Sequence, residues 1–168
     1  MAIFAAGPVR AETQDWATAS DIGAGGLIAW SVGAPLLNGD ESGALQAGLS
    51  IAAAQAITQL LKRVFPKSRP DRSDNRSFPS GHTATAFAAA SSIYERRGAD
   101  EGVPALAAAG FVGTARVQAG KHDWTDVAAG AALGSASGVL ATHRRRGSVS
   151  LAAWGTPKGG GIAFSMGF

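Results

Sequence analysis

Charged residues are confined to short segments of this 168-residue chain, and the long stretches between them contain none. Five such uncharged stretches cover residues 22–37, 42–61, 77–94, 102–115 and 127–143. The segments that separate them are rich in glycine, proline, asparagine and charged residues, which favour turns. The pattern predicts an all-α fold, a helical bundle of about five to six helices with short connections.

The composition fits one packed domain but does not decide where that domain works. Hydrophobic residues make up 46% of the chain and charged residues 16%, against about 25% in an average soluble domain. Such a chain can bury a core, so disorder is excluded, and the absence of cysteine excludes a disulfide scaffold. The mean hydropathy of +0.09 leaves both a soluble and a membrane bundle open.

The two ends of the chain have patterns of their own. Residues 1–11 are similar to the end of a secretory signal, and we interpret them as a truncated signal-peptide remnant or a ragged terminus. Residues 12–146 then form the helical domain. In residues 147–168 the apolar side chains of Ile162, Phe164, Met166 and Phe168 alternate with small ones, which predicts a short C-terminal β-hairpin.

The basic residues are gathered in a few places. Six of the fifteen lie in residues 62–76, and five more lie at 96–97 and 144–146. A basic loop of this kind is usually solvated or binds anionic lipid headgroups. Nucleic acid is not an expected partner, because Phe65 is the only aromatic residue among the cations of the loop and offers no stacking platform.

Three groups of polar residues have the chemistry of an anion site. They are Lys62 with Arg69-Pro70, then Pro79-Ser80-Gly81-His82, then Arg116 with His122 and Asp126. Lysine and arginine bind phosphate oxygens, and the backbone N–H groups of a helix start at Ser80-Gly81 suit an anion. Fixed cations can also stabilise charge in place of a metal ion, so no metal site is expected.

The third group also has the chemistry of a nucleophile. His122 and Asp126 are four residues apart and would share one face of a helix, where Asp126 can accept a hydrogen bond from one ring nitrogen. The other nitrogen is then a nucleophile or base, and His82 is a second titratable group beside the same anion. Each group alone is more often structural; the joint pattern is what favours a catalytic site.

Together, these residues resemble the signature of the type 2 phosphatidic acid phosphatase and vanadium haloperoxidase superfamily. That signature reads Lys-x6-Arg-Pro, Pro-Ser-Gly-His and Ser-Arg-x5-His-x3-Asp. This chain departs from it in two places: Ala115 replaces the usual serine, and only eight residues, 71–78, separate the first two groups.

The resemblance implies a mechanism and a set of roles. His122 attacks phosphorus to form a phosphohistidine, Asp126 orients His122, and His82 protonates the leaving group and later activates water. The phosphoryl oxygens are held by Lys62, Arg69, Ser80, Gly81 and Arg116. No cofactor is implied, and vanadate is expected to bind as an inhibitor.

The implied function is a metal-independent phosphatase acting on a phosphate monoester or pyrophosphate, with a lipid phosphate such as phosphatidate or prenyl pyrophosphate as the expected substrate. Three alternatives stay open: a soluble exported acid phosphatase, a vanadate-dependent haloperoxidase, and a non-catalytic lipid-binding relic. The sequence does not specify an oligomeric state.

Charge also predicts an orientation. If the loop at 62–78 lies outside the cytoplasm, residues 96–97 and 144–146 fall inside, in agreement with the positive-inside rule. We therefore expect an inner-membrane protein whose site faces the periplasm. The alternative is a soluble or peripheral periplasmic bundle, because the stretch 102–115 is short for a membrane span.

Overall fold

The structure is a computed structural model that describes residues 8–143, 149–156 and 159–166, with side chains described for residues 12–143. Of the predicted signal remnant, residues 1–7 lie outside the described residues. The basic segment 144–146 lies outside them as well.

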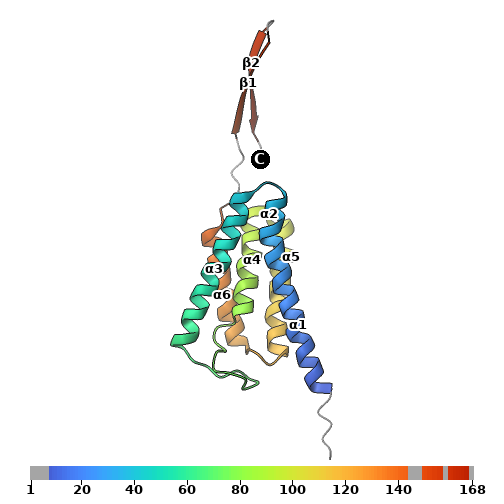
Figure 1. Cartoon of the computed structure of the whole chain (residues 1–168), viewed down its shortest axis with the longest axis vertical. Coiled ribbons are helices and arrows are strands. Elements are labelled where there is room, and N and C mark those ends of the chain that lie inside the picture. The colour runs from blue at the N-terminus through green and yellow to red at the C-terminus, as the bar shows by residue number, and fades with distance from the viewer. Residues whose placement is uncertain (1–7, 144–148, 157–158, 167–168) are drawn as a thin grey trace, which may run out of the picture.

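The described residues form the predicted all-α bundle (Figure 1). Its long helices are α1 (Pro8–Ile28), α3 (Glu41–Val64), α4 (Gly81–Arg97), α5 (Ala99–Gln118) and α6 (Trp124–Ala141). A π-helical turn η1 (Ala29–Gly33) and the short helix α2 (Ala34–Leu37) connect α1 to α3. The helices lie side by side along the long axis of the bundle.

Helix α1 corrects the helix limits that the uncharged stretches suggested. It begins at Pro8 and includes Glu12, Asp15 and Asp21, so the stretch 22–37 covers only its last third, together with η1 and α2. The physical reason is that α1 buries one side only. Ala24 and Leu27 enter the core while Glu12 and Asp15 stay exposed, so charge is tolerated within the helix.

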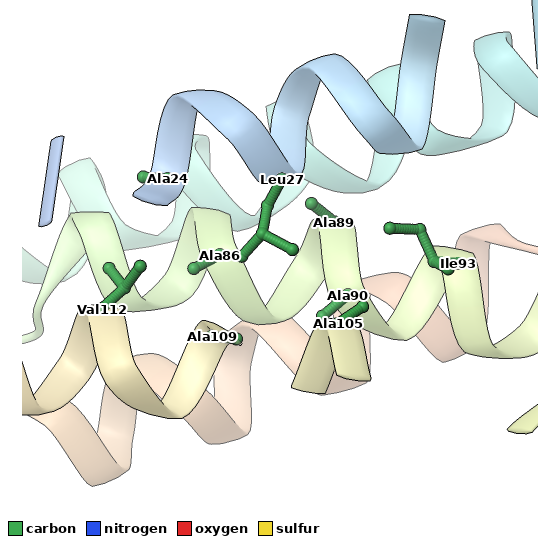
Figure 2. Close-up of a cluster of buried hydrophobic side chains, with 9 residues drawn as sticks. All are labelled: Ala24, Leu27, Ala86, Ala89, Ala90, Ile93, Ala105, Ala109 and Val112. Atoms are coloured by element: carbon green, nitrogen blue, oxygen red, sulfur yellow. The ribbon is translucent and has the colours of Figure 1, made fainter. Parts of the chain in front are cut away.

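Helix α4 is the centre of the bundle and contacts α1, α3, α5 and α6. Figure 2 shows the core where α1, α4 and α5 meet, built mainly from alanines with Leu27, Ile93 and Val112 as the larger members. Small side chains let the helix axes approach closely, so α4 has neighbours on all sides.

Helix α6 lies against α4 through a stripe of glycines four residues apart, Gly130, Gly134 and Gly138. A Cβ at Gly130 would lie 2.5 Å from the Ser80 carbonyl oxygen, and a Cβ at Gly134 would collide with the Ala84 carbonyl. The stripe therefore positions the beginning of α6 directly beside the beginning of α4, where two of the three motif groups lie.

The bundle buries small polar side chains and exposes large apolar ones. Between residues 12 and 143, twelve serines and threonines are buried, while α3 exposes Leu45, Leu49, Leu60 and Val64. In the part of the chain that the structure describes, α3 is the helix that is long and apolar enough to cross a membrane. Packing between small residues, with apolar side chains outward, is a pattern typical of helices in lipid.

Strands β1 (Val149–Thr156) and β2 (Gly159–Met166) pair antiparallel where the alternating pattern predicted a hairpin. Ala152 lies opposite Ala163, and Thr156 lies opposite Gly159 at the turn. Neither strand contacts a described helix, and Figure 1 shows the hairpin beyond the end of the bundle.

Candidate active site

The three motif groups lie at one end of the bundle. Lys62 is near the end of α3, Arg69 is in the loop that joins α3 to α4, and Ser80, Gly81 and His82 begin α4. Arg116 is near the end of α5, and His122 and Asp126 lie at the loop and first turn that begin α6. The Ser80 N–H donates to the Asp126 carbonyl at 3.0 Å, which joins the second group to the third.

His122 lies in the loop before α6, which corrects the prediction that it shares a helix face with Asp126. The loop folds back on α5: the backbone N–H groups of Lys121 and His122 both donate to the Arg116 carbonyl, at 3.1 and 3.3 Å. Gly120 allows this reversal with a φ of +67°, which side chains rarely adopt. The turn therefore brings His122 back to Arg116.

The His122 ring is buried, with 2% of its surface exposed. Burial lowers its pKa to about 3, and the charges of Arg116, Arg69 and Lys62 act in the same direction. The ring is therefore neutral at pH 7, as a nucleophile must be.

Asp126 is completely buried and is engaged mainly by groups other than His122. Its carboxylate accepts hydrogen bonds from the Ser77 hydroxyl, from Lys67 Nζ at 2.8 Å and from the Asp123 N–H at 3.1 Å. His122 Nδ1 lies 3.6 Å away and has no hydrogen-bond partner in the described part of the chain. The expected His–Asp hydrogen bond is thus absent between these described residues, because the other donors fix the carboxylate.

The ammonium group of Lys62 donates its hydrogen bonds to the backbone of the following loop. Nζ donates to the carbonyls of Arg76 and Pro79 at 2.6 Å each and to that of Ser77 at 3.3 Å. A lysine has three N–H donors, so all three are directed at carbonyls. Lys62 therefore holds the end of the loop in place, and it contributes charge rather than a hydrogen bond to the site.

The two arginines differ in how they are held. Arg69 Nε pairs with Asp74 Oδ1 at 2.7 Å, and its Nη1 donates to the Lys121 carbonyl at 3.4 Å. Arg116 is 7% exposed and donates from Nη1 to the Ser20 hydroxyl at 3.2 Å. The Arg116 Nε is buried without a hydrogen-bond partner among the described residues. A buried, unpaired guanidinium N–H is well suited to an anionic ligand.

Ser80 is the N-cap of α4, and its hydroxyl accepts from the Thr83 N–H and the Thr83 hydroxyl. Gly81 is the first residue of the helix, and its carbonyl accepts from Gln55. The α4 N-terminus therefore opens at the site end of the bundle, where its N–H groups and its helix dipole favour an anion.

Sequence reasoning missed three residues of the site. Lys67 contacts Asp123 at 2.5 Å and Asp126, Ser77 contacts Asp126, and Asp21 contacts His82. Lys67 and Ser77 lie within segments already singled out for their charge or their motif. Asp21 lies on α1, far from every motif, and no spacing pattern in the sequence connects it to His82.

His82 is partly exposed and pairs with this aspartate. Its Nε2 lies 2.9 Å from Asp21 Oδ1, and Arg116 Nη1 lies 3.6 Å from the same oxygen. Two cavities border Asp21. One, of about 670 Å³, lies between α1 and the loops that hold Asp71 and Lys121. The other, of about 300 Å³, reaches past His82 toward Ala24 and Ile28.

The described residues contain no cluster of three or more histidine and acidic side chains able to hold a metal ion. What they hold instead is a buried neutral histidine, a second histidine paired with a carboxylate, and fixed cations around both. This arrangement can bind an oxyanion, attack it and donate a proton.

Comparison with known proteins identifies the same region. A model of the PAP2 superfamily matches residues 43–149. The chain is 36% identical over 95 residues to the lipid A 1-phosphatase of Porphyromonas gingivalis, covering 55% of this chain and 21% of that protein. It is 37% identical over 82 residues to the lipid A 4'-phosphatase of Helicobacter pylori, covering 49% of this chain and 41% of that protein.

The crystal structure of LpxE from Aquifex aeolicus has the same fold, with a TM-score of 0.67 at 24% identity over 82% of this chain and 87% of that one. The chain aligns with about a fifth of the length of the first curated relative and about two fifths of the second. The family match covers most of the bundle and contains all three motif groups, so the chain belongs to the PAP2 superfamily.

Proposed function

We propose that this protein is a metal-independent phosphatase that hydrolyses the phosphate monoester or pyrophosphate of a lipid through a phosphohistidine intermediate. The observation that carries the proposal is the buried, neutral His122 beside Arg116, whose Nε is buried and has no partner among the residues that the structure describes. A neutral imidazole among fixed cations is suited to attack a phosphoryl group and to stabilise the charge of its transition state.

In the first step, His122 attacks phosphorus. Because Nδ1 is the nitrogen nearest Asp126, Nε2 is the nitrogen that forms the bond. The P–N bond forms while the P–O bond to the leaving group breaks, and His82 gives the leaving oxygen a proton. Arg69 and Arg116 hold the phosphoryl oxygens, together with the N–H groups at the start of α4.

In the second step, water replaces the histidine. Neutral His82 takes a proton from the water as its oxygen attacks phosphorus, the P–N bond breaks, and inorganic phosphate leaves with His122 restored. Asp126 stabilises the charge that His122 carries while it is phosphorylated. The mechanism uses no metal, because the cations of the chain supply the charge.

A lipid is the substrate class that the surface favours. Leu45, Leu49, Leu60 and Val64 are exposed on α3, which ends at the site. The names of the two curated relatives point to the phosphates of lipid A, and phosphatidate and prenyl pyrophosphate have the same kind of reacting group.

Phosphate release in EDTA tests this proposal. The panel comprises lipid A, phosphatidate, prenyl pyrophosphate, a nucleotide and p-nitrophenyl phosphate. We expect hydrolysis of at least one lipid phosphate, inhibition by vanadate, and an acid-labile phosphoryl label that is lost in His122→Ala. Preference for the nucleotide would favour a soluble acid phosphatase, and no hydrolysis of any substrate would favour a binding relic. Bromide oxidation with vanadate and peroxide would indicate a haloperoxidase.

We further propose that the bundle lies in the inner membrane with the site facing the periplasm. α3 supplies a helix of sufficient length, and the end opposite the site carries Arg96 and Arg97. Positive charge at that end supports a cytoplasmic location for it.

The natural absence of cysteine gives a direct test of orientation. Ser73→Cys places a thiol on the exposed loop at the site end, and Asp100→Cys places one at the opposite end. A membrane-impermeant maleimide, applied to cells with a permeabilised outer membrane, should label only the first variant. Labelling of the Asp100→Cys variant alone would indicate the opposite orientation. Equal labelling of both variants would contradict a membrane-spanning bundle.

A further inference from the structure

Asp21 joins the active site from outside the family's motifs. It lies on α1, and the family match begins at residue 43. Its neighbour Ser20 is buried and accepts a hydrogen bond from Arg116. Leu27 anchors the same helix in the core two turns later. The packing of α1 therefore determines where Asp21 lies.

The charged groups around His82 indicate how Asp21 affects the protonation of its ring. Arg116 of α5 and Arg69 of the loop are the cations that face His82, and α3 presents the uncharged Gln55. Asp21 is the carboxylate in contact with His82 among the described residues, at 2.9 Å. Burial, Arg116 and Arg69 lower the pKa of His82, while Asp21 opposes this shift. Without Asp21, the ring would lose its proton more readily.

We propose that Asp21 is a positioning residue that holds His82 as the proton donor for the leaving group. The inference rests on the proposed phosphatase function. Asp21 accepts the Nε2–H of the imidazolium, so the Nδ1–H is the proton that passes to the leaving oxygen as the P–O bond breaks. In the second step Nδ1 takes back a proton from water, and the Nε2–H bond to Asp21 holds the ring throughout.

The competing interpretation is that Asp21 merely occupies the anion site through Arg116, 3.6 Å away, and is displaced by substrate. The two interpretations predict opposite results for Asp21→Asn. Loss of a positioning carboxylate reduces kcat, whereas loss of a competing carboxylate lowers KM and leaves kcat unchanged.

The test uses the chain of 168 residues with phosphatidate and p-nitrophenyl phosphate as substrates. Phosphatidate releases an alkoxide that needs a proton, and p-nitrophenolate leaves without one. We expect Asp21→Asn to lower kcat on phosphatidate about 10- to 100-fold, part of the roughly 10²- to 10⁴-fold typical of general acid catalysis. The loss on p-nitrophenyl phosphate should stay within about 3-fold. Asp21→Glu should recover part of the activity, and Asp15→Asn on the same helix is the matched control.

The pH profile gives the second readout. A general acid works only while protonated, so activity falls as pH rises through its pKa. Removing Asp21 should therefore move the basic limb of kcat/KM on phosphatidate to lower pH. Equal losses on both substrates, an unmoved basic limb, or a lower KM with unchanged kcat would each overturn the proposal.

Nitrogen NMR of labelled histidine separates this proposal from the proposed function. The His82 titration, assigned with His82→Gln, should move to lower pH in Asp21→Asn even if neither substrate is hydrolysed. An unchanged His82 titration would refute the role of Asp21 while leaving the phosphatase function intact. Loss of hydrolysis in the wild-type protein, with the shift present, would refute the function alone.

Discussion

The site contains two histidine–aspartate pairs, and they are built in different ways. His122 and Asp126 lie four residues apart in one segment, are both buried, and stand 3.6 Å apart without a hydrogen bond. His82 and Asp21 come from α4 and α1; His82 is partly exposed, Asp21 is exposed, and they are in contact at 2.9 Å. The comparison shows that nearness in sequence does not ensure contact. The Asp126 carboxylate accepts hydrogen bonds from Ser77 and Lys67, whereas the Asp21 carboxylate contacts His82 and lies near Arg116.

The difference suits the two proposed tasks. His122 must remain neutral to attack, and a carboxylate held at a distance by other donors does not force a proton onto it. His82 must carry a proton, and a carboxylate in direct contact favours the charged ring. One pair therefore favours a nucleophile and the other an acid.

The largest effect expected is from His122→Ala. Removing the proposed nucleophile should reduce turnover by more than about 10³-fold, because His122 is the group that forms the covalent intermediate in the proposed mechanism. Vanadate binding, followed by calorimetry, should survive, since the cations remain. His143→Ala, at the other end of the bundle, is the control and should keep full activity. If the His122→Ala variant turned over substrate at nearly the wild-type rate, His122 and Asp126 could not have the proposed roles.

A smaller but still large effect is expected from Asp126→Asn. The change keeps the size of the side chain but removes the charge opposite Lys67, and we expect about a 10²-fold loss of kcat on both phosphatidate and p-nitrophenyl phosphate. Asp21→Asn, by contrast, should lower kcat on phosphatidate much more than on p-nitrophenyl phosphate. If Asp126→Asn lowered kcat on one substrate much more than on the other, the two histidine–aspartate pairs would not have the separate roles proposed here. Far-ultraviolet circular dichroism checks that the variant is folded.

The smallest change is one of protonation. Because burial and three cations lower the pKa of His122 to about 3, its ring should remain neutral from pH 8 down to about pH 5. The proton is gained only below that range, so acid should inactivate the nucleophile near pH 3. Nitrogen NMR of labelled histidine, assigned with His122→Ala, measures this directly. A midpoint near the ordinary value of 6.5 would contradict it.

Much of the fold and site could be predicted from the chain alone. The uncharged stretches predicted a helical bundle, and the alternation after residue 147 predicted the hairpin. Gly130, Gly134 and Gly138 recur every four residues, and α4 packs closely against the helix face that they form. The start of α1 was missed, because a helix with one buried side tolerates charge on its other side.

Within the site, the motifs identified the residue types but not their contacts. The spacing of His122 and Asp126 suggested a shared helix face, yet α6 begins only at Trp124. Lys62 was expected to bind phosphate, yet its three donors go to carbonyls of the following loop. Every residue has a backbone carbonyl, so the sequence does not indicate which carbonyls will accept these hydrogen bonds.

The sequence by itself determined which residue types the candidate site contains: two histidines, two arginines, a lysine and a capped helix start, in the order of the PAP2 signature. The tertiary structure alone decided which partner each group has. Asp21 reaches His82 across 61 positions of the chain because small alanine side chains let α1 lie close to α4 and α5. Such a contact depends on how closely two helices pack, and packing is a property of surfaces brought together rather than of spacing along the chain.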